Sequence, residues 1–115
     1  DYSVVCKAEF GSTSFLLTGD AEKLVEKQLI RENFDLSADI LKCGHHGSST
    51  SSCSEFLDEV NPSAAIISCG KNNDYGHPHK EVTNRLTKAG ILILRTDLAG
   101  NVHFRTDGET IELLP

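Results

Sequence analysis

Residues 39–49 read Asp-Ile-Leu-Lys-Cys-Gly-His-His-Gly-Ser-Ser, a short apolar run that ends in two adjacent histidines between glycines. Two other apolar runs end in the same way, in Thr-Gly-Asp at residues 18–20 and, farther on, in Tyr-Gly-His-Pro-His at residues 75–79. In α/β proteins, ligand and metal sites lie at strand ends and in the glycine-rich turns that follow them. Clustered imidazoles with one carboxylate therefore suggest metal chemistry.

Length and composition bound the chain to one ordinary domain. Its 115 residues are enough to bury a core and leave no room for a second domain. The formal net charge of −6 provides no basic surface that would bind nucleic acid nonspecifically, so a polyanionic substrate would need local attraction. No apolar run approaches the roughly 20 residues that cross a bilayer, and no signal pattern opens the chain, so this piece is expected to be soluble by itself.

The four cysteines show no pattern of a metal or disulfide framework. They are Cys6, Cys43, Cys53 and Cys69, and they lack the close pairs of structural zinc sites and disulfide-rich miniproteins. We therefore expect the cysteines to be small apolar residues of the core. The alternative is a ligand role for Cys43 beside His45.

Hydrophobic periodicity predicts alternating strands and helices. Strands are expected at residues 4–10, 14–18, 40–43, 64–69, 91–95, 102–105 and 110–113. Helices are expected at residues 21–33, 56–60 and 78–89. The order ββαβαβαβββ indicates an α/β layer in which helices cover a mixed sheet.

Local signals set the expected ends of these elements. Asp20 caps the first helix, and Pro78 lies in the first turn of the third helix, which Gly90 closes. The expected inner faces of these two helices are Ala21, Leu24, Val25 and Leu29, and Val82, Leu86 and Ala89. Residues 48–54 form a polar loop, and the last three strands form a β-meander.

Three motifs occur in order along nearly the whole chain. They are Leu-Leu-Thr-Gly-Asp-Ala-Glu at residues 16–22, Leu-Lys-Cys-Gly-His-His-Gly-Ser-Ser at residues 41–49 and Asn-Asp-Tyr-Gly-His-Pro-His at residues 73–79. Together they resemble the metallo-β-lactamase superfamily, and more narrowly the branch that contains the hydrolase domain of the ComEC/Rec2 competence proteins. The turns at residues 95–97 and 100–102 also suit that branch. The resemblance implies the C-terminal half of a metallo-β-lactamase-type αββα sandwich.

The resemblance implies a role for each matching residue. Asp20 matches the carboxylate that bridges two metal ions, and either His45 or His46 matches a histidine ligand of the second metal. We favour His46 as the ligand and His45 as the residue that faces the substrate, so the candidate catalytic residues are Asp20 and His45. Two divalent ions, zinc or manganese, would activate a water molecule and stabilise the charge that develops on a phosphoryl oxygen.

Substrate-binding roles are implied for Ser48, His77 and His79. Ser48 would bind phosphate, and the two histidines would line the opposite wall. Each assignment has a plainer alternative: Asp20 is only a helix cap, the paired histidines are a polar turn, residues 49–52 are a flexible loop, and His77 and His79 cap the third helix. Residues to which we assign no chemistry are Glu22, Lys42 and His103.

The chain departs from the family at its first motif. The early His-x-His-x-Asp-His motif and a further histidine, which supply most of the family's metal ligands, have no match here. The chain has no methionine and begins Asp1-Tyr2-Ser3 directly before a strand pattern. We therefore interpret it as the C-terminal half of the domain without its N-terminal partner. Catalytic zinc usually has three protein ligands plus water, so we expect a partial or empty site and an inactive fragment.

Two function classes follow from these observations. In the first, the intact protein is a metal-dependent hydrolase of a phosphodiester, with DNA as the candidate substrate and a thioester or lactam as a weaker option. In the second, the chain is a non-catalytic module of a DNA-uptake protein. Half a sandwich leaves an apolar sheet face exposed, so we expect a homodimer or the N-terminal half to cover it. A ComEC-like parent would place the domain at the extracytoplasmic side of a membrane; the sequence alone assigns no location.

Overall fold

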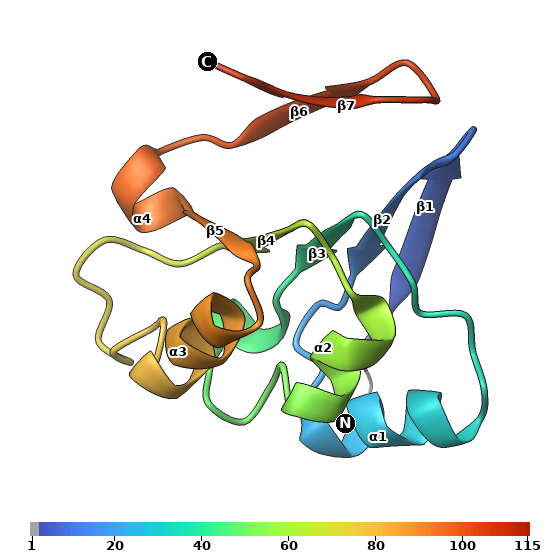
Figure 1. Ribbon diagram of the computed structural model, residues 1–115. Helices are drawn as coiled ribbons and strands as arrows, with labels where there is room; N and C mark the ends of the chain where they lie inside the picture. The colour runs from blue at the N-terminus through green and yellow to red at the C-terminus, as the bar shows by residue number, and fades with distance from the viewer. Residues whose placement is uncertain (1–2) are drawn as a thin grey trace.

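A five-stranded sheet forms the centre of the computed structural model, which describes residues 3–115 (Figure 1). Its strands, in spatial order, are β1 (Cys6–Phe10), β2 (Thr13–Leu17), β3 (Ile40–Lys42), β4 (Ala64–Ile67) and β5 (Leu92–Arg95). β1 and β2 form an antiparallel hairpin, whereas β2 to β5 pair in parallel. The predicted α/β class with a mixed sheet is confirmed. Asp1 and Tyr2, with which the chain opens, lie outside the described residues.

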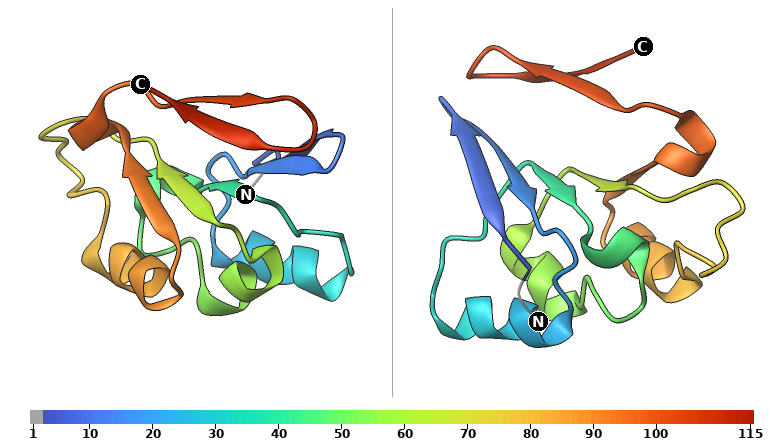
Figure 2. Two further views of the ribbon diagram at one scale, coloured as in Figure 1. Left: turned by 45° about the horizontal axis from the view of Figure 1, so that its top comes forward. Right: turned by 180° about the vertical axis from the view of Figure 1, so that it is seen from behind.

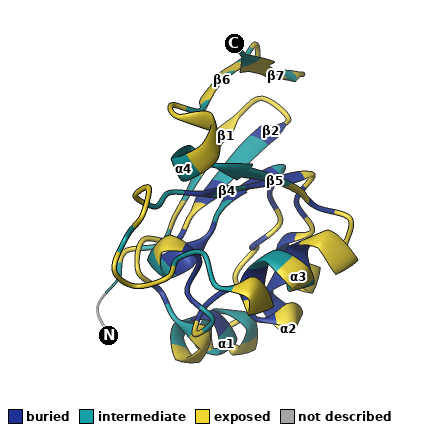
Figure 3. Cartoon of the chain, turned by 90° about the vertical axis from the view of Figure 1, so that its left-hand side faces the viewer, coloured by how far each residue is buried: buried dark blue, intermediate teal, exposed yellow. Residues whose placement is uncertain are grey.

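Three helices cover one face of this sheet (Figures 1 and 2): α1 (Lys23–Arg31), α2 (Ser54–Val60) and α3 (Lys80–Lys88). The core lies between the sheet and these helices, where Figure 3 shows most of the buried residues. Its largest fully buried apolar side chains include Phe56, Leu16, Leu41, Ile67, Leu86, Val60 and Val82. Within residues 3–115, no helix is long and apolar enough to span a membrane.

The predicted order of elements is confirmed, with two short additions. A tight turn, Gly44–Gly47, follows β3, and a four-residue helix, α4 (Thr96–Ala99), follows β5. β6 (His103–Thr106) and β7 (Ile111–Leu114) form a separate hairpin. The predicted meander is wrong for the strand after α3, because β5 pairs in parallel with β4 and α4 then carries the chain away from the sheet.

The β6–β7 hairpin lies on the opposite side of the sheet from the three helices (Figures 1 and 2). It contacts β2 through the rings of Phe15 and Phe104, whose centroids are 6.1 Å apart, and the hydroxyls of Thr13 and Thr106, which are 2.8 Å apart. A pocket of about 320 Å³ remains between the hairpin and the sheet. On this side Leu92 is 58% exposed, so the second face is only partly covered. Its coverage by a homodimer or an N-terminal half stays a prediction.

α1 differs from the prediction at its start and on its inner face. Its N-cap is Glu22 rather than Asp20, and the N-cap side chain forms no capping hydrogen bond. Leu24, expected in the core, is 73% exposed, whereas Glu26 is fully buried. The prediction is wrong here because periodicity considers only apolar side chains, and the loop that faces this position presents backbone N–H groups.

α3 also begins later than predicted. Its N-cap is His79, so Pro78 precedes the helix instead of occupying its first turn. The inner-face residues Val82 and Leu86 are fully buried as expected. Ala89 is exposed, because it follows the last turn of the helix and lies at the C-cap.

Buried Glu26 anchors the serine-rich loop that follows the histidines. Its carboxylate accepts the N–H of Ser52 at 2.6 Å and that of Cys53 at 3.0 Å. Burial raises the pKa of Glu26, and the two N–H donors oppose that rise. Arg85 of α3 donates to the carbonyls of Ser51 and Ser52. The stretch interpreted as a flexible loop is therefore a bonded connection between α1 and α3, and that interpretation is wrong.

Glu26→Ala should strongly destabilise the fold. The substitution leaves the buried N–H groups of Ser52 and Cys53 without an acceptor, which costs about 1–3 kcal/mol for each group. We therefore expect the free energy of unfolding in urea to fall by roughly 2–5 kcal/mol. Glu32→Ala, at an exposed carboxylate just after α1, is the matched control and should change it by less than about 0.5 kcal/mol. Equal losses in the two variants would contradict the anchoring role.

Candidate functional site

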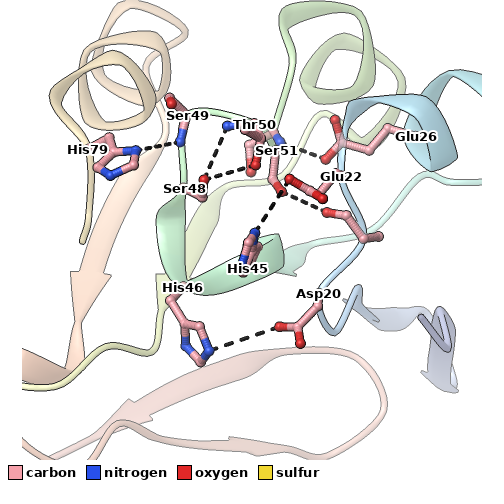
Figure 4. A network of polar contacts seen from close by, with 12 residues as sticks. Asp20, Glu22, Glu26, His45, His46, Ser48, Ser49, Thr50, Ser51 and His79 are labelled. Atoms are coloured by element: carbon pink, nitrogen blue, oxygen red, sulfur yellow. Dashed lines mark hydrogen bonds and ion pairs between the residues drawn. The ribbon is translucent and has the colours of Figure 1, made fainter. Parts of the chain in front are cut away.

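Three loops meet at the carboxyl edge of the parallel strands (Figure 4). Residues 18–22 follow β2, the Gly44–Gly47 turn follows β3, and residues 68–79 follow β4. Because β2, β3 and β4 are parallel neighbours, their carboxyl ends lie at the same edge, where open α/β sheets bind ligands. The fold therefore brings together the three motifs of the sequence.

The Gly44–Gly47 turn, called the histidine turn below, holds both of its histidines in an unusual backbone conformation. His45 (φ 50°, ψ 46°) and His46 (φ 57°, ψ 28°) are left-handed. That conformation costs an L-residue roughly 1–2 kcal/mol. Backbone bonds hold it in place: the N–H of His45 donates to the Gly19 carbonyl at 2.9 Å, and the N–H of His79 donates to the Gly47 carbonyl at 3.0 Å. Such strain is concentrated at functional sites.

The two glycines of the turn are required by close packing. A Cβ on Gly44 would lie 2.5 Å from the carbonyl oxygen of Ala21. A Cβ on Gly47 would lie 2.8 Å from Cβ of Pro78 and 3.0 Å from Cγ2 of Ile67. The Gly-His-His-Gly sequence thus lets the turn pack between the Asp20 loop and the loop that precedes α3.

Asp20 and His46 face each other across this edge. Oδ1 of Asp20 lies 3.9 Å from Nε2 of His46, and both side chains are about half exposed or more. Nδ1 of His46 lies 2.8 Å from the carbonyl oxygen of Ser68, which can only accept a hydrogen bond. A neutral His46 ring in this position carries its proton on Nδ1 and its lone pair on Nε2, the arrangement common in metal-binding histidines. The choice of His46 over His45 as the ligand stays a prediction.

His45 has an acidic neighbour that the sequence reasoning missed. Its Nδ1 is buried and forms no hydrogen bond within the described part of the chain. The Glu22 carboxylate lies 3.6 Å from that nitrogen. The available signal was the position of Glu22 two residues after Asp20, in the same loop. In a neutral His45 ring, a carboxylate beside Nδ1 favours the tautomer that carries the proton on Nδ1.

A pocket of about 240 Å³ connects these side chains. Its lining residues are Asp20, His45, His46, Tyr75 and His77. The centroid of the His77 ring lies 5.8 Å from that of His45 and 5.9 Å from that of His46. Burial, followed by repulsion from the three neighbouring histidines, lowers the pKa of His77. The pocket therefore combines imidazoles with one exposed carboxylate.

Ser48 and His79 do not line this pocket. Ser48 is 4% exposed, and its hydroxyl lies 2.9 Å from that of Thr50. Nδ1 of His79 accepts the N–H of Ser49 at 2.8 Å (Figure 4). Nε2 of His79 lies 3.1 Å from the carbonyl oxygen of Tyr75. Both side chains thus bond neighbouring loop residues, and their substrate-binding roles stay predictions. His103 is an exposed strand residue, as expected.

The cysteines divide into buried and accessible thiols. Cys43 and Cys53 are core residues, and burial raises the pKa of each to about 11. A neutral buried thiol is a poor ligand, so the core interpretation of Cys43 is favoured over metal binding. Cys6 is exposed and Cys69 is half-buried, so the core expectation is wrong for Cys6.

The donor set fits part of a divalent metal site. Within residues 3–115, no group of three His, Cys, Asp or Glu side chains is placed to hold a metal ion. Asp20 offers a carboxylate oxygen and His46 its Nε2, and metal–ligand bonds of about 2.0–2.2 Å put both atoms within reach of one ion. These residues fit as two ligands of a site that needs further groups for completion.

Curated proteins resemble this chain along nearly all of its length. The chain is 45% identical over 103 residues to ComE operon protein 3 of Bacillus subtilis (strain 168), a match that covers 90% of this chain and 13% of that protein. It is 41% identical over 103 residues to Competence protein ComA of Neisseria gonorrhoeae, a match that covers 89% of this chain and 15% of that protein. It is 36% identical over 112 residues to Recombination protein 2 of Haemophilus influenzae, a match that covers 97% of this chain and 14% of that protein. The chain thus spans about one seventh of the length of these relatives, and no family model matches it.

Gly47→Ala should destabilise the chain more than Gly90→Ala. Both glycines have positive φ, 79° and 76°, so each alanine loses about 1 kcal/mol or slightly more through its backbone. Only Gly47 is also crowded, because nothing lies within 4 Å of a Cβ on Gly90. We expect an additional loss of about 1–3 kcal/mol for Gly47→Ala in urea unfolding. Equal effects would contradict the close packing of the histidine turn.

Thiol labelling should separate Cys6 from the buried cysteines. A thiol with a pKa of about 11 is only about 0.1% ionised near pH 8, and burial further blocks the reagent. With iodoacetamide in native buffer, Cys6 should be alkylated first, and Cys43 and Cys53 only after unfolding, as measured by peptide mass spectrometry. Alkylation of Cys43 as fast as that of Cys6 would contradict its place in the core.

Proposed function

Because the chain is homologous to one segment of competence proteins of the ComEC/Rec2 type, we propose that it is a module of a DNA-uptake protein and forms one wall of a metal-dependent phosphodiesterase site. The names of the relatives support the competence-type module and do not mention hydrolysis. The assignment to a metallo-β-lactamase-type half-sandwich is part of the same proposal. The observation that carries the hydrolase is the position of Nε2 of His46, 3.9 Å from the Asp20 carboxylate, in a pocket with two more imidazoles.

Asp20 and His46 are the residues that would hold a divalent ion, zinc or manganese. When bound, such an ion acts as a Lewis acid that stabilises negative charge on a phosphoryl oxygen. The Ser68 carbonyl fixes the tautomer and orientation of the His46 ring before any ligand arrives. Within residues 3–115, no backbone N–H donates to the Asp20 carboxylate, and Glu22 occupies the N-cap position predicted for Asp20.

His45 would act directly on the substrate. Its ring lines the pocket, and the Glu22 carboxylate beside Nδ1 positions it with Nε2 available. A nitrogen in this state can accept a proton or, once protonated, donate a hydrogen bond to a phosphate oxygen. The His77 ring, on the opposite wall, is kept neutral by burial and by its neighbours, so it can contact the substrate without adding charge.

The remaining ligands would come from outside this chain. Two residues are fewer than the three that catalytic zinc sites usually use, and a second ion would need more. We propose that an N-terminal half of the same domain supplies them and covers the partly exposed sheet face. Location at the outer side of a membrane is proposed only through the resemblance to ComEC-type proteins.

A non-catalytic module is the second candidate function. It is favoured by the absence, within residues 3–115, of a three-ligand metal group, and by the exposed apolar side chains on the second sheet face. In this alternative the histidines bind one adventitious ion at most, and the sheet face docks a partner or a second copy. A weaker hydrolase alternative acts on a thioester or lactam instead of a phosphodiester.

Elemental analysis with an activity assay distinguishes the two candidates. Two samples would be compared, this chain and a form extended upstream by about one half-domain, each assayed with bis-p-nitrophenyl phosphate. We expect near two metal ions per extended chain and at least roughly 100-fold slower turnover in Asp20→Ala. Asp58→Ala removes one exposed carboxylate from α2 and is the matched control, which should leave both values unchanged. Absence of metal and of turnover in both samples would rule out the hydrolase and leave the module.

A further inference from the structure

Tyr75 is a large aromatic side chain that core packing does not explain. It is 77% exposed, on the loop between β4 and α3. The loop is nevertheless held in place from inside by Asn73. Oδ1 of Asn73 accepts the N–H groups of Tyr75 at 3.1 Å and His77 at 3.0 Å, and Nδ2 donates to the carbonyls of Gly70 at 2.9 Å and His77 at 2.8 Å. Tyr75 is therefore presented to solvent on a preorganised loop.

The Tyr75 ring is the outer end of a row of nearly parallel rings. Its centroid lies 5.6 Å from that of His77, with 19° between the planes. The His77 ring in turn lies 5.9 Å from His46, with 23° between the planes. These separations are in the range of offset aromatic stacking. The row leads from the exposed loop to the Asp20–His46 pair.

Two pockets flank this row of rings. One is the 240 Å³ pocket that contains Asp20 and His45. The other has a volume of about 150 Å³, and its lining residues are His46, Cys69, Gly70, Asn73, Tyr75 and His77. Both pockets share His46, Tyr75 and His77. A ligand with a charged group in the first pocket can therefore place a flat apolar group against the rings of the second.

We propose that Tyr75 and the 150 Å³ pocket form a base-stacking subsite for one unpaired nucleobase of single-stranded DNA, whose backbone phosphate lies in the Asp20 pocket. This inference rests on the proposed phosphodiesterase function and adds to it the strandedness of the substrate. A base in a duplex is already stacked on both faces, so it does not reach the Tyr75 ring. Stacking on an aromatic ring contributes roughly 1–3 kcal/mol per base and tolerates any sequence.

The negative charge of the chain gives an uncharged contact with DNA a clear use. With a net charge of −6, the protein has no general attraction for a polyanion. A contact that does not depend on positive charge would therefore add to the affinity for DNA that bound metal ions supply. Stacking on a neutral tyrosine is a contact of that kind.

The test compares two single strands of equal charge. Fluorescein-labelled dT hexamer and an identically labelled hexamer of abasic deoxyribose phosphates would each be titrated with the 115-residue chain, without divalent metal and at physiological ionic strength, which screens repulsion between like charges. Anisotropy should show tighter binding of the dT hexamer. Tyr75→Ala should weaken dT binding by roughly 5- to 100-fold and leave the abasic strand unchanged, whereas Tyr75→Phe should retain wild-type affinity. Phe34→Ala removes another exposed aromatic, after α1, and should have no effect.

An independent readout uses the two tyrosines of the chain. In a sample with 13C-labelled tyrosine, comparison with Tyr2→Phe assigns the NMR signals of the Tyr75 ring. These signals should move upfield with the dT hexamer and stay unmoved with the abasic hexamer. Equal affinity for both strands, or full dT binding by Tyr75→Ala, would overturn the subsite.

The same experiment separates failure of the subsite from failure of the proposed hydrolase. Tyr75-dependent binding of dT without turnover by the extended chain would reject the hydrolase alone. If turnover requires Asp20 but the affinity for the dT hexamer is unchanged in Tyr75→Ala, the subsite alone is rejected.

Discussion

The close approach of the histidine turn to its two neighbouring loops is the constraint on which the site depends. Gly44 lets the turn touch the carbonyl of Ala21, and Gly47 lets it touch Pro78 and Ile67. With a side chain at either glycine, the turn would have to retreat from the Asp20 loop or from the loop before α3. The left-handed backbone of the two histidines persists because the surrounding packing holds the turn in this conformation. Close packing of the three loops, rather than any single strong bond, therefore brings the Asp20 carboxylate and the imidazoles together.

A second layer of polar contacts keeps this edge rigid. The loop after the turn is fixed from below by Glu26 and Arg85, which belong to different helices and bond the same backbone segment. His79 bonds the start of that segment and the Tyr75 carbonyl at once. His79, for which a substrate-binding role is predicted, thus also connects two loops through its ring nitrogens. The histidines at this edge therefore differ in their hydrogen-bonding partners.

The sequence predicted the parts of the fold that depend on local patterns. β3 and β4 are buried parallel strands, which appear as short apolar runs, and Asn61 ends α2 in a left-handed conformation that this residue tolerates well. The motifs identified the edge of the sheet that carries the site. What failed depends on contacts between distant segments. Glu26 is buried because N–H groups from residues 52 and 53 meet it, and periodicity of apolar residues contains no such information.

The same limit explains the errors at the site and at the C-terminal end. Asp20 precedes a helix, which predicts a cap, but its carboxylate faces His46 because the histidine turn lies opposite. Glu22 received no role because its partner is 23 positions away in the sequence and comes near only through parallel pairing of β2 and β3. β5 was assigned to a meander because hairpin signals follow it, although its partner β4 lies before α3. The motifs therefore identified which residues lie together at this edge of the sheet. The contacts of each side chain depend on residues that are distant in the sequence, which the motifs do not contain.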